Sequence, residues 1–132
     1  MDSRPASLTA SLKQAGFTTL QFVAAAGLAL VLFVTVANLV VVQYGQGAVR
    51  SSLEEGVRAG SRVGAGEEDC LVAAQESLRS LLGGSMGTGV VLSCALGNGL
   101  IVATAEGSLP SWLPGIADFV VDAEALAVKE TA

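Results

Sequence analysis

Cys70 and Cys94 are the two residues of this sequence whose side chains could react with each other. In oxidising surroundings such an even pair can form a disulfide. The alternative is a pair of buried thiols in a cytosolic domain. The sequence leaves both interpretations open.

The sequence contains no histidine, and this limits the chemistry that the chain can perform. Histidine is the commonest general base and metal ligand. A Ser-His-Asp or Cys-His arrangement is therefore impossible, and two cysteines are too few for a tetrahedral zinc site. We expect no enzymatic activity, no catalytic residue, no metal site and no cofactor.

Three further features resemble binding sites, and each has a simpler structural explanation. The glycine-rich run at residues 83–89 lacks the Lys-Ser/Thr of a phosphate-binding loop and precedes an expected strand, so we expect a turn. Asp118, Asp122 and Glu124 are potential calcium ligands, but the alternation of the last two predicts one solvated strand face. Trp112 could contact a partner or a membrane interface, or cover the core of a sheet, which we favour.

The most prominent element is the apolar stretch at residues 17–42, FTTLQFVAAAGLALVLFVTVANLVVV. No charged residue occurs between Lys13 and Arg50. As a helix the stretch would be about 39 Å long, which is enough to cross a hydrocarbon core of about 30 Å with some tilt. It is too long for the apolar core of a cleaved secretory signal. We therefore expect a transmembrane helix, with Thr35 and Asn38 bonded to the backbone or to a neighbouring helix.

Charge is distributed unevenly on the two sides of this stretch. Residues 1–16 carry two cations and one acid, whereas residues 43–132 carry five cations and eleven acids. The acidic C-terminal region argues against nucleic acid as a partner. The cations near the two ends of the span are too evenly balanced to set its orientation. The cysteines favour a C-terminal region outside the cytoplasm, because a disulfide needs oxidising surroundings.

The helical pattern continues beyond the span. Val49, Leu53 and Val57 recur every four residues, which predicts an amphipathic continuation. Glu54 and Arg58 have the spacing of a stabilising ion pair on one helix face. We expect one helix from about residue 15 to about residue 62.

A stripe of small residues lies on this continuation, at Gly56, Gly60 and Gly64. A long helix with such a pattern suits lateral packing against other copies or partners. The expected organisation has four parts. They are a leader or cytoplasmic tail at residues 1–16, the span at 17–42, the extramembrane continuation of the helix at 43–63 and a small domain at 64–132.

The pattern of residues 64–132 predicts a small α+β domain. After a Gly-Ala-Gly break, acids precede leucines at helical spacing, and a Gly-Gly pair ends this second, short helix. Three strands are predicted at residues 89–96, 100–107 and 119–128, with a Gly-Asn-Gly turn between the first two. A three-stranded antiparallel sheet needs a cover on its apolar face, so we expect the second helix to pack on it. A Cys70–Cys94 disulfide would tie the start of that helix to the first strand.

Three short motifs resemble those of a known family. They are AGFTTLQF at residues 15–22, LEEGVRAG at residues 53–60 and LPSWLPG at residues 109–115. The first resembles the junction between the polar leader and the apolar helix of type IV pilin-like proteins. The Glu-Gly-x-Arg-Ala run after the span and the Pro-Gly before the last strand resemble those of TadE-like minor pseudopilins of tight-adherence (Flp-type) pili. The resemblance covers nearly the whole chain.

The resemblance implies cleavage by a prepilin peptidase between Gly16 and Phe17, on the cytoplasmic side of the membrane. The fifth residue of the mature chain would then be Gln21. The family usually carries Glu at this position, where the acid is tied to filament assembly. Gln21 can hydrogen-bond the amino terminus of a neighbouring chain but cannot form the ion pair. The proline that is common in the apolar stretch of the family is also absent.

The resemblance also implies a structural or assembly role in a pilus or related secretion filament. The chain would be a single-pass cell-membrane protein with a cytoplasmic N-terminus and an extracytoplasmic domain, before incorporation into a pilus at the cell surface. The expected partners are membrane lipid, a prepilin peptidase, and other pilins or tight-adherence assembly proteins that contact the long helix. The alternative is a permanently anchored extracytoplasmic binding or accessory subunit that never leaves the bilayer.

Overall fold

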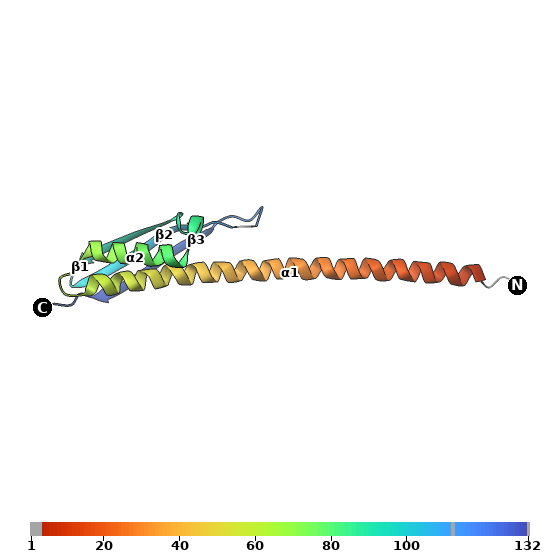
Figure 1. Ribbon diagram of the computed structural model, residues 1–132, viewed down its shortest axis with the longest axis horizontal. Coiled ribbons are helices and arrows are strands. Elements are labelled where there is room, and N and C mark those ends of the chain that lie inside the picture. The colour runs from red at the N-terminus through yellow and green to blue at the C-terminus, as the bar shows by residue number, and fades with distance from the viewer. Residues whose placement is uncertain (1–3, 112, 132) are drawn as a thin grey trace. The chain divides into compact units, whose positions relative to one another are not determined.

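The computed structural model describes residues 4–111 and 113–131. The elements follow in the order α1 (Arg4–Ser61), α2 (Glu67–Leu81), the 3₁₀ turn η1 (Gly84–Gly87), β1 (Val90–Gly97), β2 (Leu100–Leu109) and β3 (Phe119–Val128) (Figure 1). This is the expected α+β arrangement of a long apolar N-terminal helix, a short second helix and a three-stranded sheet. The chain divides into two units, Met1–Ala37 and Asn38–Ala132, and we describe each by itself.

The helix α1 begins at Arg4, about eleven residues earlier than the sequence pattern predicts. Pro5 lies in the first turn, where proline is tolerated because the amide there has no intrahelical partner. The Ala, Leu, Lys and Gln residues that follow favour a helix. The sequence predicts a leader or tail here, because residues 1–15 are mostly polar and show no helical hydrophobic period.

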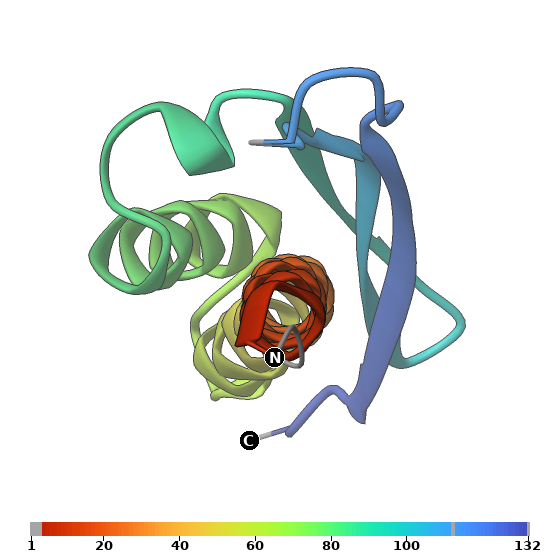
Figure 2. The same ribbon diagram turned by 90° about the vertical axis from the view of Figure 1, so that its right-hand side faces the viewer.

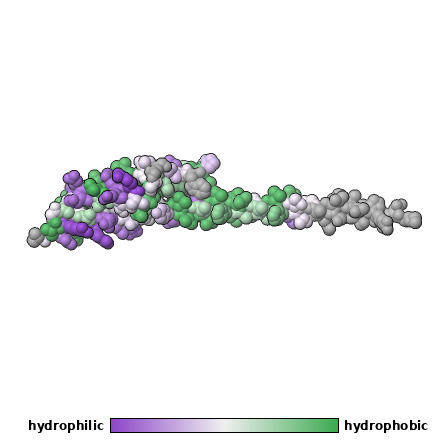
Figure 3. Space-filling model, in the orientation of Figure 1, coloured by the Kyte–Doolittle hydropathy of each residue, from purple (hydrophilic) through white to green (hydrophobic). Residues whose placement is uncertain are grey.

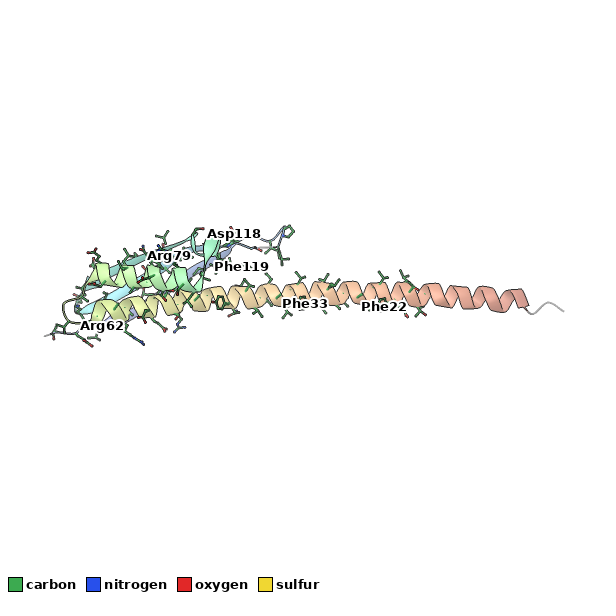
Figure 4. The ribbon with its side chains drawn as sticks, viewed as in Figure 1. Phe22, Phe33, Arg62, Arg79, Asp118 and Phe119 are labelled. Carbon is green, nitrogen blue, oxygen red and sulfur yellow. A yellow bond between two sulfur atoms is a disulfide. The ribbon has the colours of Figure 1, made fainter. Side chains whose placement is uncertain are left out.

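Within the first unit, residues 16–37 of α1 expose apolar side chains on all sides of the helix. Figure 4 shows Phe22 and Phe33 projecting outward from α1, with 72% and 69% of their surface exposed. Hydrophobic residues dominate the described surface of this segment (Figure 3). Among the described residues, one helix is long and apolar enough to cross a membrane; it lies within Gly16–Ser61, and only 6% of its most apolar window is buried.

In the second unit the three strands form an antiparallel sheet in the order β1-β2-β3. A two-residue turn at Asn98 and Gly99 joins β1 to β2, and both residues have positive φ, of 53° and 73°. A type I′ turn requires these values, which Asn-Gly adopts at low cost. The turn therefore sets a register in which Gly97 faces Leu100.

Side chains alternate between the two faces of the sheet. On the central strand β2, Ile101, Ala103 and Ala105 are buried, whereas Leu100 and Glu106 are exposed. The helix α2 and the second half of α1 both cover the buried face (Figure 2). The expectation that the second helix covers the sheet is correct, but α1 supplies part of the cover as well. The helix α1 contributes Ala48, Val49, Leu53 and Val57 to the hydrophobic core.

Two glycines of α1 allow α2 to approach closely. A Cβ atom on Gly56 would lie 2.8 Å from Cβ of Ala74 and 2.9 Å from the carbonyl oxygen of Cys70. A Cβ atom on Gly60 would lie 2.8 Å from Cβ of Cys70. At Gly56 and Gly60 the expected stripe of small residues is therefore occupied by the chain's own second helix and is not open to another copy.

The third glycine of that stripe, Gly64, belongs to the Gly-Ala-Gly break that the sequence predicts after the helix. It lies beyond the end of α1 with φ of 81° and helps the chain to turn.

The ion pair expected between Glu54 and Arg58 differs in the structure. Glu54 contacts Arg50 at 3.4 Å, one helical turn before it, and not Arg58, one turn after it.

The ammonium group of Lys129 stabilises the C-terminal end of α1. It donates hydrogen bonds to the carbonyl oxygens of Gly60, at 3.0 Å, and of Arg62 and Ala65. The last carbonyls of a helix have no intrahelical partner and carry partial negative charge, which a cation compensates. The backbone amide of Glu130 also donates to the carbonyl of Ser61 at 2.8 Å. The end of β3 is thus tied to the end of α1.

Replacing Lys129 by Met retains the apolar stem and removes these hydrogen bonds. We expect Lys129→Met to lower the free energy of unfolding by about 1–2 kcal/mol, because three carbonyls lose a charged donor. Denaturant unfolding of the full chain in detergent micelles, followed by circular dichroism, measures this change. The matched control is Arg50→Met, which removes a surface ion pair worth about 0–1 kcal/mol. Equal losses for the two variants would contradict the capping role.

Replacing Gly56 by Ala tests the close approach of the two helices. Alanine normally favours a helix by about 1 kcal/mol over glycine. Here we expect Gly56→Ala to destabilise the domain by about 1–3 kcal/mol, because the new methyl meets backbone atoms that cannot easily move. Gly47→Ala is the control, since its Cβ would meet nothing within 4 Å. It should stabilise the same helix in the same unfolding measurement, and a gain for Gly56→Ala would contradict the packing described.

Candidate functional site

The expected processing site lies on the surface of the first unit. Gly16, Phe17 and Gln21 are all exposed on α1. A Cβ atom on Gly16 would meet nothing within 4 Å, so packing does not explain the glycine. Because Phe17 and Gln21 are four residues apart, they lie on one side of the helix, about one turn from each other. Nothing in the described contacts blocks access to the Gly16–Phe17 bond.

Two polar residues of the apolar segment differ in how they are satisfied. Oγ1 of Thr35 donates a hydrogen bond of 2.8 Å to the carbonyl of Val31, as the sequence predicts for a threonine in such a helix. Asn38 is buried at the start of the second unit, and its Oδ1 has no hydrogen-bond partner among the described residues.

The second unit brings the two cysteines together. Their sulfur atoms are 2.01 Å apart and their Cα atoms 6.2 Å apart, which is the spacing of a disulfide. Cys70 lies in the first turns of α2 and is fully buried, while Cys94 lies on the edge strand β1. The bond joins these two elements, as expected if the cysteines are oxidised, and its burial suits a structural role.

The neighbourhood of the disulfide also fixes the start of α2 to β1. The side chain of Glu67 accepts a hydrogen bond of 2.8 Å from the amide of Leu96 on the strand edge. Oδ2 of Asp69 accepts a hydrogen bond of 2.9 Å from the amide of Gly66, at the beginning of the helix. Acids in the first turn also compensate the partial positive charge of a helix N-terminus. The acidic run that predicted a helix start therefore has two structural roles.

The opposite end of α2 contains a contact that sequence reasoning missed. The hydroxyl of Tyr44 on α1 donates a hydrogen bond of 3.0 Å to the carbonyl of Leu81, the last residue of α2. No local signal connects two residues so far apart in the chain.

A groove of about 410 Å³ lies between α2 and β1, with Leu78, Leu82 and Val90 among its lining residues.

The residues that resembled calcium or phosphate sites have structural surroundings. Oδ1 of Asp118 accepts a hydrogen bond of 3.1 Å from the amide of Ser111 and closes the loop between β2 and β3. Asp122 and Glu124 are exposed on the face of the sheet away from the helices, which confirms the solvated face. The glycine-rich run contains η1 and leads into β1. The interpretation of Trp112 concerns a residue outside the described part of the chain.

Comparisons of this chain with protein-family models, with curated proteins and with solved structures gave no match.

Removal of the disulfide should destabilise the second unit markedly. The Cys70–Cys94 bond joins residues 24 positions apart in the sequence. We therefore expect Cys94→Ala to lower the free energy of unfolding by about 3 kcal/mol. Thiol labelling of the denatured but unreduced protein should find no free cysteine, and labelling after reduction should find two. Ser93→Ala is the control, because it alters the neighbouring exposed residue and leaves the bond intact. Two reactive thiols before reduction would contradict the bond.

Proposed function

We propose that the protein is a membrane-anchored assembly subunit of the TadE-like pseudopilin type, acting in a tight-adherence (Flp-type) pilus or a related secretion filament. The observation that carries the proposal is the change of environment along α1. Its first part exposes apolar side chains on all sides, and its second part is covered by a small disulfide-bonded α+β domain.

The exposed apolar part of α1 supports membrane anchoring. A fully apolar helix that is not covered by protein is unfavourable in water and favourable in lipid. A helix also satisfies its own backbone hydrogen bonds, which a bilayer requires. The same surface can later pack against neighbouring helices in a filament. This two-stage use of one helix is what the family resemblance implies.

The disulfide supports an extracytoplasmic position for the domain. Structural disulfides persist in oxidising surroundings and are rare in the cytosol. The charges near the span do not set its orientation, so the sulfur chemistry carries this part of the proposal. With the domain outside, Gly16 and Phe17 lie toward the cytoplasmic end of the helix, where a prepilin peptidase acts.

The mature N-terminus tests the processing step. Mass spectrometry of the full chain from cells with an active prepilin peptidase should find a protein that begins at Phe17. Gly16→Leu should leave the leader attached, because a bulky residue replaces the glycine that the peptidase requires. Gly27→Leu, deeper in the same helix and equally free of neighbours, should not affect cleavage. An intact leader in the unchanged protein would contradict processing.

The second candidate is a permanently anchored extracytoplasmic subunit, and Gln21 is the observation that favours it. An amide in place of the family's acid removes the ion pair with a neighbouring amino terminus. Filaments sheared from cells distinguish the two functions. A pseudopilin should co-purify with the filament fraction, whereas a permanent anchor should remain in the membrane. If Gln21→Glu increases the filament fraction several-fold, the amide is what limits incorporation.

A further inference from the structure

One end of the second unit brings together two stretches that carry no charge. On α1 the sequence has no charged residue between Asn38 and Val49, and on β2 and the following loop none between Gly107 and Ala117. Leu109 packs beside Gly45, where a Cβ atom would lie 2.5 Å from Leu109 Cδ1. We call residues 38–49, 107–111 and 113–117 the uncharged end.

Contacts along α1 place this end within the unit. Gly60 lies beside Ile101 near the start of β2, and Gly45 lies beside Leu109 at its last residue. The strand β2 therefore runs antiparallel to α1. The loop that follows Leu109 lies where α1 enters the unit at Asn38, and Figure 1 shows it extending beyond the strands.

The loop is built as a closed apolar turn. Gly115 has φ of 86°, and the amide of Ile116 donates to the carbonyl of Leu113 at 3.4 Å. Proline at the second position and a positive φ at the third define a type II turn. The turn satisfies its own backbone bond and leaves Ile116 46% exposed. Val120, next to the loop on β3, is 80% exposed.

Charge is concentrated away from this end. Asp118, the one charged residue of the loop, is held by the amide of Ser111. The nearest charges outside the loop are Arg50 on α1, Arg79 in the last turn of α2, and the carboxylates of Glu106 and Asp122, which face each other across β2 and β3. On the face shown in Figure 3, hydrophilic residues gather toward the opposite end of the unit, near the C-terminus.

We propose that the uncharged end rests in the lipid–water interface, with the turn at Leu113–Ile116 in contact with lipid. This inference rests on the proposed membrane anchoring. From Asn38 the sequence continues without charge back to Gln14, and a helix that spans the bilayer must bring this end to the membrane surface. Apolar side chains beside closed backbone turns partition into that interface, whereas charged groups stay in water. The loop then sets how deeply the helix sits and how the domain is tilted on the membrane.

The single tryptophan makes the inference testable in the full chain. Trp112 is the only tryptophan of the sequence and is next to Leu113. Under this inference, the membrane-interface interpretation of Trp112 replaces the sheet-covering one. The protein is reconstituted in phosphatidylcholine liposomes, with and without lipids brominated on the acyl chain near the headgroup. We expect brominated lipid to quench the tryptophan fluorescence, and aqueous acrylamide to quench it less than in the denatured chain. Full acrylamide quenching without any effect of bromine would overturn the inference.

Two variants make the experiment specific to the loop. Ile116→Asp introduces a charge at the exposed corner of the turn, and we expect it to abolish quenching by brominated lipid. The control is Val128→Asp, since Val128 is also apolar and, at 72%, more exposed than Ile116, but pairs with Leu100 at the opposite end of the sheet. It should leave the quenching unchanged. An equal loss in the two variants would overturn the inference.

Flotation of the same liposomes separates this inference from the proposed anchoring. Protein that floats with the lipid but whose tryptophan is not quenched contradicts the interfacial loop alone. Protein that does not float contradicts the anchoring itself. If the fluorescence shifts to the blue only as protein density in the bilayer rises, a second copy covers the loop and lipid does not.

Discussion

The close approach of α1 to α2 at Gly56 and Gly60 is the constraint on which the rest of the domain depends. Only residues without a side chain fit there, because Cys70 and Ala74 occupy the space that a Cβ atom would need. The contact places Cys70 against the sheet, where its disulfide ties α2 to the edge strand β1. At the other edge, Lys129 ties β3 to the end of α1. Both edges of a small sheet are therefore held to the helices that cover it.

The helix α1 exposes apolar side chains in the first unit and buries them in the second, with one backbone geometry. An α-helix satisfies its backbone hydrogen bonds internally, so the proposed anchoring in lipid requires no change of backbone structure. Only the distribution of apolar side chains differs. In the described part of the first unit apolar side chains lie on all sides of the helix, whereas in the second unit they form one face that includes Val49, Leu53 and Val57. The uncharged end lies where the second pattern begins, and this is why we place it at the membrane surface.

Local signals predicted much of the fold. The Asn-Gly turn and the alternation of side chains gave the correct hairpin, and the third strand, Phe119–Val128, has its predicted bounds. The signal was weaker where residues have no hydrophobic period. The start of α1 at Arg4 was missed for this reason, and so was the extension of β2 to Leu109. The family resemblance, and the roles of Gly16, Phe17 and Gln21 that it implies, stay predictions.

The apolar helix, the α+β pattern and the lack of histidine can be read from the sequence alone, because each depends on residue type and local spacing. Which side chains meet depends on how the elements pack. The tertiary structure joined Cys70 to Cys94, placed Lys129 on the carbonyls that end α1, and assigned Gly56 and Gly60 to the chain's own second helix. These contacts join residues that are distant in the chain. No periodicity encodes them, because they exist only once two elements have packed against each other.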